Sequence, residues 1–184
     1  MSETGTLFVI AGPSGAGKDT LIKEVVKGGG VHLSVSATTR KPREGEVDGR
    51  DYHFLSDGEF ERLVEEGAFL EWKEVYGNRY GTLKDEVDGA VSSGRDVILE
   101  IDVKGALDVK AEAPEARLIF VMPPSLEELE ARLRGRKADT EDEIRVRMDL
   151  APWEIETGRN EFDHLIVNDD VERAARELAR VMGR

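Results

Sequence analysis

The chain has 184 residues, of which 39% are apolar, so it has the length of one domain and enough apolar residues for a buried core. It contains no cysteine, which excludes disulfides and cysteine-based metal sites, and no run of about 18 apolar residues that could span a membrane. Its formal net charge of -13 should repel nucleic acids and anionic membranes, so an anionic ligand would need a local basic cluster.

The N-terminal residues predict a buried strand, a glycine-rich turn and a helix. Residues 7–11 are apolar, are β-branched at their centre and precede a Gly-Pro pair, which is typical of a buried strand. The helix after the turn ends at the glycines 28–30. Its apolar positions are Leu21, Ile22, Val25 and Val26. Residues 31–35 then predict a second strand.

The region that begins at Ser36 and continues to about Tyr80 is rich in arginine, glycine and aromatic residues, and its elements are short. We interpret it as an inserted subdomain. Within it, Ser56 and Glu59 predict a capping box that opens a helix. One face of this helix carries Phe60, Leu63 and Val64. A helix that ends at Gly94 leads back out of the subdomain. Its apolar positions are Leu83, Val87, Ala90 and Val91.

The second half of the chain alternates strands with helices. Residues 96–102 predict a buried strand with acids at its C-terminal end, and residues 118–122 predict another, which two prolines end. The helix between them has Ala106, Leu107 and Val109 as apolar positions. Residues 164–167 predict the last strand. Asp170 then opens a terminal helix with apolar positions Val171, Ala174, Leu178 and Val181.

Two further helices should lie between the last two strands. Ser125 and Glu128 predict a capping box, and the helix behind it should turn three leucines inward. These are Leu126, Leu129 and Leu133. Thr140 and Glu143 predict another capping box. Buried strands that alternate with helices imply an α/β fold, in which helices cover both faces of a parallel sheet.

Residues 12–18 predict a nucleotide phosphate site, because a glycine-rich turn stands between a strand and a helix. Its members are Gly12, Pro13, Ser14, Gly15, Ala16, Gly17 and Lys18. The glycines let several backbone N–H groups face one point, the helix N-terminus adds a partial positive charge, and Lys18 adds a full one. Together these groups suit the β- and γ-phosphates of a nucleotide.

Asp19 departs from the usual pattern, in which Ser or Thr follows the lysine and binds Mg²⁺. A carboxylate beside a triphosphate is unfavourable unless a cation lies between them. Asp19, which Thr20 follows, therefore either contacts Mg²⁺, directly or through water, or points away as an acid at a helix N-terminus. Glu100 and Asp102 end a strand, where they could orient Mg²⁺ or reach the acceptor. For Asp102, a helix cap is the alternative.

A basic cluster predicts a second anion site. Arg40, Lys41 and Arg43 fill three of four positions, and Pro42 favours an extended backbone before it. Two guanidiniums with a tyrosine would suit a phosphate dianion. The alternative is a solvated basic loop, which is less expected in a chain of net charge -13.

From Gly12 to Leu178, the chain resembles the guanylate kinases. The matching stretches are residues 12–18, 34–40, 42–49, 51–54, 70–72, 76–81, 98–105, 123–125, 134–136 and 166–170. So many matches in order are more specific than any single motif. The resemblance implies Mg²⁺-dependent transfer of the ATP γ-phosphate to GMP, in purine nucleotide metabolism. It also implies a phosphate-loop core of residues 1–35, 93–125 and 160–184, an inserted GMP-binding subdomain of residues 36–92, and a lid region of residues 126–159.

The resemblance assigns the acceptor site as well. By similarity, the ligands of the GMP phosphate are Arg40, Arg43, Tyr52 and Tyr80. Ser36 and Thr82 would donate to guanine O6. Glu71 would accept from guanine N1–H and N2–H₂, a pair of donors that adenine lacks on that edge. Asp102 would lie near the amino group or the phosphates.

The lid residues follow from the same resemblance. Arg132, Arg136 and Arg147 match arginines of the family's mobile lid, which would stabilise charge on the transferring phosphoryl group. Considered singly, each resembles the arginines that are common on exposed helices. Lys137 stands where the family usually has glycine, so we expect the lid turn to differ. Asn168 matches a region that contacts adenine, and without the resemblance it indicates only a cap.

Two alternative functions remain. A related family of ribose bisphosphate kinases also has Asp after the loop lysine, but that family lacks the guanine-reading set present here. Non-catalytic guanylate-kinase-like modules bind phosphopeptides and usually lose residues that this chain keeps, namely Lys18, Arg136 and Arg147.

We therefore expect ATP, Mg²⁺ and GMP as ligands, no nucleic acid or membrane partner, and a monomer or small homo-oligomer. The first six residues do not resemble a signal peptide, so we expect a cytoplasmic protein. The three histidines show no metal-ligand spacing and are interpreted as structural: His32, His53 and His164. Trp72 and Trp153 are interpreted as core or boundary residues.

Overall fold

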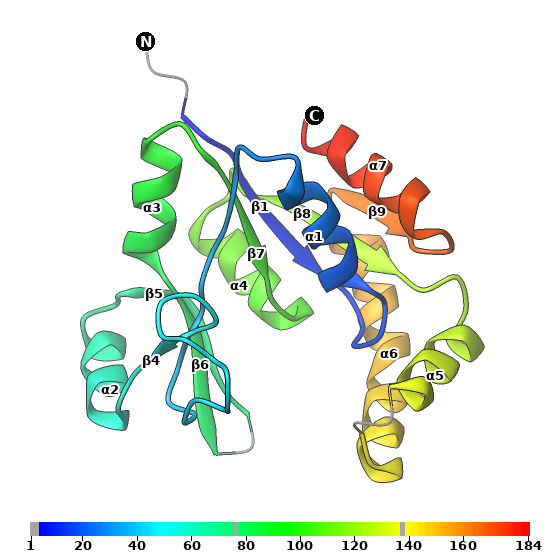
Figure 1. The fold of residues 1–184 in the computed structure, drawn as a ribbon, viewed down its shortest axis with the longest axis horizontal. Helices are drawn as coiled ribbons and strands as arrows, with labels where there is room; N and C mark the ends of the chain where they lie inside the picture. Colours follow the sequence, from blue (N-terminus) through cyan, green and yellow to red (C-terminus); the bar gives the residue numbers. More distant parts are fainter. Residues whose placement is uncertain (1–3, 76, 137–138) are drawn as a thin grey trace.

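The structure, a computed structural model, describes residues 4–75, 77–136 and 139–184. A five-stranded parallel sheet forms its centre, in the order β2-β7-β1-β8-β9 (Figure 1). The strands are β1 (Leu7–Ala11), β2 (Val31–Leu33), β7 (Asp96–Glu100), β8 (Arg117–Met122) and β9 (His164–Val167). The parallel sheet that the sequence predicts is confirmed.

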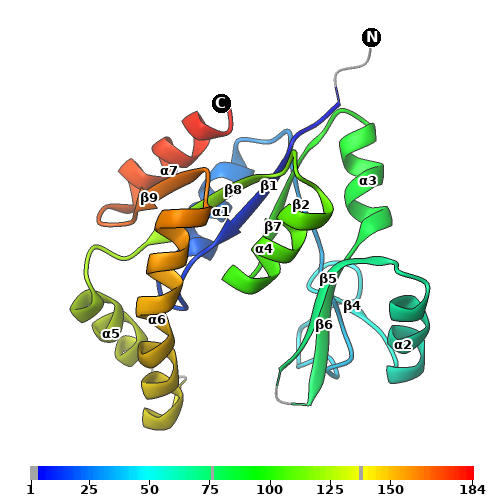
Figure 2. The same cartoon turned by 180° about the vertical axis from the view of Figure 1, so that it is seen from behind.

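Helices cover both faces of this sheet, because successive side chains of a strand point to opposite faces. The covering helices are α1 (Lys18–Lys27) and α7 (Val171–Val181) on one face, and α3 (Lys84–Ser92) and α4 (Val103–Glu112) on the other. In β1, Phe8 and Ile10 pack toward the first pair, while Leu7, Val9 and Ala11 pack toward the second. Figure 2 shows α4 lying over the sheet. None of the described helices is long and apolar enough to cross a membrane.

The inserted region forms a second sheet with the strand order β4-β3-β6-β5. Its strands are β3 (Ala37–Thr38), β4 (His53–Phe54), β5 (Phe69–Val75) and β6 (Asn78–Leu83). Helix α2 (Asp57–Glu65) packs against it through Phe60, whose ring stacks on Phe69 with 4.5 Å between centroids. The sequence predicts short elements here but no sheet, because two-residue strands are too short to show a period of two.

Two helices form a third part, on the side of the molecule opposite the second sheet (Figure 1). These are α5 (Leu126–Gly135) and α6 (Glu141–Glu161). Their shared core consists of Leu129, Leu133, Ile144 and Ala151. Helix α6 continues to the central sheet, where Gly158 lies against the ring of Phe120. A Cβ atom at position 158 would lie 2.4 Å from the Phe120 Cγ atom, so a larger residue does not fit.

The structure corrects three predicted element ends. Strand β2 stops at Leu33 rather than residue 35, because the backbone N–H of Val35 donates to the Glu86 carboxylate at 2.6 Å instead of continuing the ladder. Strand β7 stops at Glu100 rather than residue 102, because Asp102 caps α4. Leu83 belongs to the end of β6 and not to the helix that follows.

The helix caps are largely confirmed. Complete capping boxes open α2 at Ser56 and α6 at Thr140. At α5, Ser125 accepts from the Glu128 N–H at 3.1 Å, but the Glu128 carboxylate pairs with Arg132 at 2.9 Å instead of closing the box. The prediction that Leu126 faces inward is wrong, since 37% of it is exposed. The first turn of α5 therefore faces solvent, and the buried leucines of this helix begin only after that turn.

Both tryptophans lie at the surface rather than in the core. Trp72 is 44% exposed and its ring meets Phe60 edge-on, while Trp153 is 39% exposed beneath the ammonium of Lys104. These contacts explain how large apolar rings are held at a boundary without full burial.

Glu86 joins the central sheet to the inserted subdomain. Its carboxylate contacts the Nε2 atoms of His32 in β2 and His53 in β4, at 3.2 and 2.7 Å, as well as the Val35 N–H. Burial alone would raise the pKa of Glu86, but these hydrogen bonds together hold it below its ordinary value. The structural interpretation of His32 and His53 is thereby supported.

Glu86→Gln should destabilise the protein and flatten the acid side of its stability curve. A carboxyl group with a lowered pKa adds stability above its ordinary pKa, and this stability is lost as the pH falls through the lowered value. We expect a loss of about 1–3 kcal/mol near neutral pH, as for other hydrogen bonds to charged groups. Urea unfolding at a series of pH values measures this. Glu65→Gln, at an exposed position of α2, is the control, and equal losses in both variants would contradict the role of Glu86.

Candidate active site

A cleft of about 640 Å³ runs from the phosphate loop to the second sheet. The predicted site residues on its walls are Gly12, Ser14, Lys18, Asp19, Ser36, Tyr52, Glu71, Tyr80, Glu100, Asp102 and Arg147. They come from the loop after β1 and the start of α1, from the residues just before β3 and β4, from the β5–β6 hairpin, from the end of β7 and from helix α6. The fold therefore brings residues more than 100 positions apart in the chain into one site.

The phosphate loop wraps around the start of α1. Gly17 has a φ of 90°, in the left-handed region that favours glycine. A Cβ atom there would also lie 2.3 Å from Nδ2 of Asn168. The ammonium of Lys18 folds back to donate to the carbonyls of Gly12 and Pro13, at 2.8 and 3.3 Å. Burial lowers the pKa of Lys18, and the nearby carboxylates oppose this effect. The loop is thus preformed, with its lysine at the centre.

Asn168 packs against the phosphate loop. Its side chain is 3% exposed and donates to the Ala16 carbonyl at 2.8 Å, while its Oδ1 atom is buried with no hydrogen-bond partner in the described part of the chain. The cap of α7 is Asp170, which accepts from the Arg173 N–H, so a capping role for Asn168 is wrong. Its contact with ATP stays a prediction.

Asp19 and Glu100 form an acid pair beside Lys18. The two carboxyl groups lie within hydrogen-bonding contact. Burial first, and then Asp19, raise the pKa of Glu100 to about 8, while the hydrogen bond from Glu100 holds the pKa of Asp19 below its ordinary value. Glu100 therefore holds its proton to a higher pH than an ordinary carboxyl group does. Thr20 is exposed and is not among the residues that line the cleft.

Asp102 has both of its oxygens engaged. Its Oδ1 accepts from the Gly105 N–H at 2.8 Å, which confirms the helix cap, and its Oδ2 pairs with the ammonium of Lys73. No group of three or more metal-ligating side chains occurs among residues 4–75, 77–136 and 139–184. The acid pair could nevertheless hold a divalent cation together with phosphate oxygens and water, because such a cation prefers carboxylate oxygens as ligands.

The carboxylate that the sequence analysis predicts to contact guanine also lines the cleft. Glu71 is 8% exposed, and its Oε1 accepts from the Thr82 hydroxyl at 2.8 Å. Burial raises the pKa of Glu71, and the Thr82 hydrogen bond partly offsets this. Thr82 is 1% exposed and its only hydroxyl proton is used here, so it positions Glu71 instead of facing the cleft. Ser36 does line the cleft.

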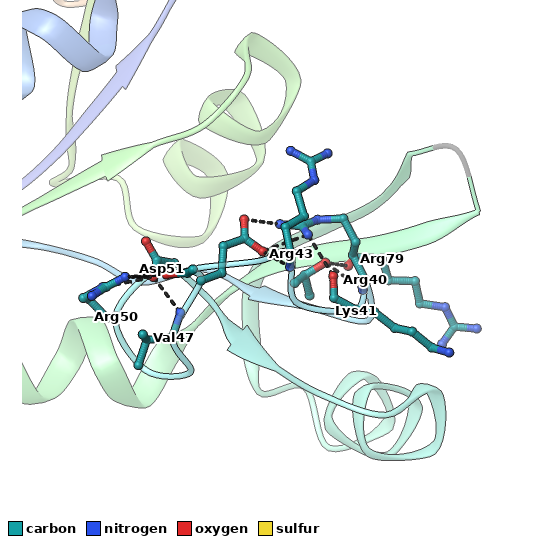
Figure 3. Close-up of polar contacts among 10 residues, drawn as sticks. Arg40, Lys41, Arg43, Val47, Arg50, Asp51 and Arg79 are labelled. Carbon is teal, nitrogen blue, oxygen red and sulfur yellow. Dashed lines mark hydrogen bonds and ion pairs between the residues drawn. The ribbon is translucent and has the colours of Figure 1, made fainter.

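In this structure, one arginine of the predicted basic cluster forms an ion pair with a carboxylate of the same loop. Arg40, labelled in Figure 3, donates to both oxygens of Glu46, at 3.0 and 2.8 Å. Its guanidinium also lies 5.3 Å from the centroid of the Tyr52 ring. Glu46 also accepts from the Arg43 N–H at 2.7 Å. Arg40 first, and then this N–H, lower the pKa of Glu46 to about 2. The Arg43 side chain is exposed, and no contact of its guanidinium with Glu46 is found in the described part of the chain.

The three arginines that the sequence analysis assigns to a lid differ in position. Arg147 reaches the phosphate loop, where it contacts the Ser14 hydroxyl, and also pairs with Asp139 at 3.1 Å. Arg132 instead donates to Glu128 and to the Asn168 carbonyl, at 2.9 and 3.0 Å. Arg136 is exposed at the end of α5. The expected difference at Lys137 lies outside the described residues, as does Tyr76 in one matching stretch.

The cleft also contains two charged residues that the sequence analysis missed. Lys73 and Glu154 line it from β5 and α6. Each has a signal in the sequence: Lys73 stands two positions after Glu71 on one strand, and Glu154 stands seven positions after Arg147 on one helix. Both spacings place side chains on the same face. Burial raises the pKa of Glu154, and the positive charges of Lys18 and Lys73 partly oppose this.

Known proteins share this architecture and sequence. The family model described as guanylate kinase matches residues 4–184. The guanylate kinase of Rubrobacter xylanophilus is 51% identical over 181 residues, which cover 98% of this chain and 94% of that protein. That of Caldanaerobacter subterraneus is 46% identical, with 99% and 88% covered. The crystal structure of guanylate kinase from Anaplasma phagocytophilum is similar with a TM-score of 0.77 and 32% identity, with 98% and 86% covered. The chain belongs to the guanylate kinase family.

Proposed function

We propose that this protein transfers the γ-phosphate of ATP to GMP, giving ADP and GDP. One observation carries the proposal: a single cleft joins a phosphate loop with its lysine to a buried carboxylate, Glu71, that a hydroxyl holds in place. Membership of the guanylate kinase family supports the same reaction. Neither a ribose bisphosphate acceptor nor a phosphopeptide has a corresponding observation in its favour.

Recognition of guanine follows from the chemistry of Glu71. A carboxylate accepts hydrogen bonds only, and the N1–H and N2–H₂ groups of guanine present two adjacent donors. Adenine presents an acceptor at N1, which a carboxylate would repel. Because Thr82 occupies one side of Glu71 and the hairpin buries it, the remaining lone pairs would be available to the base. An unpaired buried carboxylate is costly, so the site should reject bases without these donors.

The reaction needs alignment and charge neutralisation, and no covalent intermediate. The phosphate oxygen of GMP attacks the γ-phosphorus, the bond to the β–γ bridging oxygen breaks, and ADP leaves. Lys18 and Arg147 already lie at the phosphate loop and would stabilise the equatorial oxygens. Arg40, Arg43, Tyr52 and Tyr80 would hold the acceptor phosphate. Closure of residues 36–92 and 126–159 over the core would bring Arg132 and Arg136 closer and exclude water.

Mg²⁺ is the cofactor that we propose for ATP. Asp19 and Glu100 fit it because both carboxyl groups line the cleft beside Lys18, and carboxylate oxygens are ligands that Mg²⁺ prefers. The ion would supply positive charge to the triphosphate. The chain's own contribution is to orient the two carboxylates and to keep Lys18 on the loop.

Coupled measurement of ADP release, with GMP, dGMP, AMP, CMP, UMP and ribose 1,5-bisphosphate as acceptors, tests the proposed reaction. We expect turnover with GMP and little with AMP. In Glu71→Gln, kcat/KM for GMP should fall by about 100-fold or more, since hydrogen bonds to a charged group contribute about 1.5–3 kcal/mol each. Glu74→Gln, on the exposed face of the same strand, is the control. Turnover restricted to the ribose compound, or none, would refute the proposal.

Glu100→Gln should remove a pH-dependent loss of stability from the nucleotide-free protein. The folded-state pKa of Glu100, about 8, lies above its unfolded value, so the native protein binds the extra proton and loses stability as the pH rises between the two values. Glutamine cannot ionise. The melting temperature of the variant should therefore exceed that of the wild type at about pH 8 and above, and the difference should shrink in weak acid. A constant difference across this range would contradict the acid pair.

Asp19→Ser tests the proposed metal contact. If Asp19 helps to hold Mg²⁺, the variant should require a higher Mg²⁺ concentration for half-maximal turnover, because a neutral hydroxyl replaces a charged ligand. Initial rates at fixed ATP and GMP over a Mg²⁺ series measure this. Unchanged turnover and unchanged Mg²⁺ dependence would leave Asp19 as an acid at a helix N-terminus without contact to the ion.

A further inference from the structure

Lys73 lies in the middle of the acceptor end of the cleft. On the β5–β6 ladder, Glu71 pairs with Thr82 and Lys73 pairs with Tyr80. Residues 71 and 73 face the same side of the strand, because side chains alternate. The ladder therefore runs from the proposed guanine-reading pair to the proposed phosphate ligand Tyr80, and Lys73 stands directly beside that ligand.

The ammonium of Lys73 spans the space between the hairpin and α4. It pairs with Asp102 at the N-terminus of that helix, which lies next to β5 (Figure 2). Asp102 is itself anchored through its bond to the Gly105 N–H. The Lys73 side chain is 38% exposed, so its head is reachable from the cleft. An ion pair this open to water contributes little stability and can exchange partners.

The distribution of charge shows why a cation matters at this place. Five acidic side chains line the cleft, those of Asp19, Glu71, Glu100, Asp102 and Glu154. Three cations oppose them: Lys18, Lys73 and Arg147. Lys18 and Arg147 both contact the phosphate loop. Among the lining residues, Lys73 is thus the cation at the acceptor end, and Arg40 nearby is occupied by Glu46.

We propose that Lys73 binds the phosphate of the acceptor nucleotide, with Asp102 holding its ammonium ready while the cleft is empty. On binding, the ammonium exchanges the Asp102 carboxylate for a phosphate oxygen. It then lies on the side of the acceptor phosphate that faces α4 and the phosphate loop. This inference rests on the proposed function, since it assumes that the acceptor is a nucleoside monophosphate. The competing explanation is that Lys73 only neutralises Asp102 and never contacts substrate.

Binding measurements without ATP separate these explanations. Direct titration calorimetry gives the affinity for GMP, and competition against GMP in the same calorimeter gives the affinity for guanosine, which has the base but no phosphate. In Lys73→Met, GMP binding should weaken by about 10-fold, a loss of roughly 1.4 kcal/mol, while guanosine binding stays unchanged. Lys73→Arg should recover part of the GMP affinity because it keeps the charge. Lys84→Met, at a lysine on α3 that pairs with Glu112, is the matched control.

The double variant Lys73→Met/Asp102→Asn completes the test. If Lys73 contacts phosphate, removal of the Asp102 charge leaves GMP binding weak. Restored GMP affinity in the double variant would overturn the proposal, as would unchanged GMP affinity or equal losses for GMP and guanosine in Lys73→Met. Failure of the proposed function is distinguishable, because the wild-type protein would then neither bind GMP nor turn it over.

Discussion

Parallel pairing of β1 with β7 is the constraint on which the site depends. The ladder sets Ile10 opposite Glu100, so the loop that follows β1 and the acids that end β7 meet at one edge of the sheet. Parallel strands require crossovers, and here the crossover between these two strands contains α1, β2, the whole inserted subdomain and α3. The second sheet, which contains the predicted acceptor residues, is therefore part of this crossover. After it, the chain returns to the central sheet and ends β7 beside the phosphate loop.

The cations of the site are mostly paired with the protein's own carboxylates. Arg40 pairs with Glu46, Lys73 with Asp102, Arg132 with Glu128 and Arg147 with Asp139. Partly exposed pairs of this kind contribute only about 0–1 kcal/mol, so a phosphate can replace the carboxylate at small cost. These pairs also keep the cations oriented in a chain of net charge -13, in which an isolated basic cluster would attract other anions. Under the proposed function, substrate phosphates would take the place of these carboxylates.

Much of the fold could be predicted because its signals are local. Strand β1 and the capping boxes at Ser56 and Thr140 depend on residues within a few positions of one another. Element ends were less predictable where a distant group decides them: β2 stops because Val35 donates to Glu86, 51 positions away. The small sheet of the inserted subdomain was not predictable, since β3 and β4 have two residues each and exist only through their pairing.

The sequence by itself determined the phosphate loop, the alternation of strands and helices, and the family resemblance. All three depend on neighbouring residues, or on the order of short stretches along the chain. Only the tertiary structure decided the ionic partners. It brought Asp19 next to Glu100 and Glu46 next to Arg40. It also paired Lys73 with Asp102 and placed Asn168 against the phosphate loop. The contacts of Asp19, Lys73 and Asn168 join segments that meet only when the chain folds, while Arg40 and Glu46 meet through the turn of one loop. Coulomb and hydrogen-bond energies depend on such distances, and no local pattern in the chain encodes them.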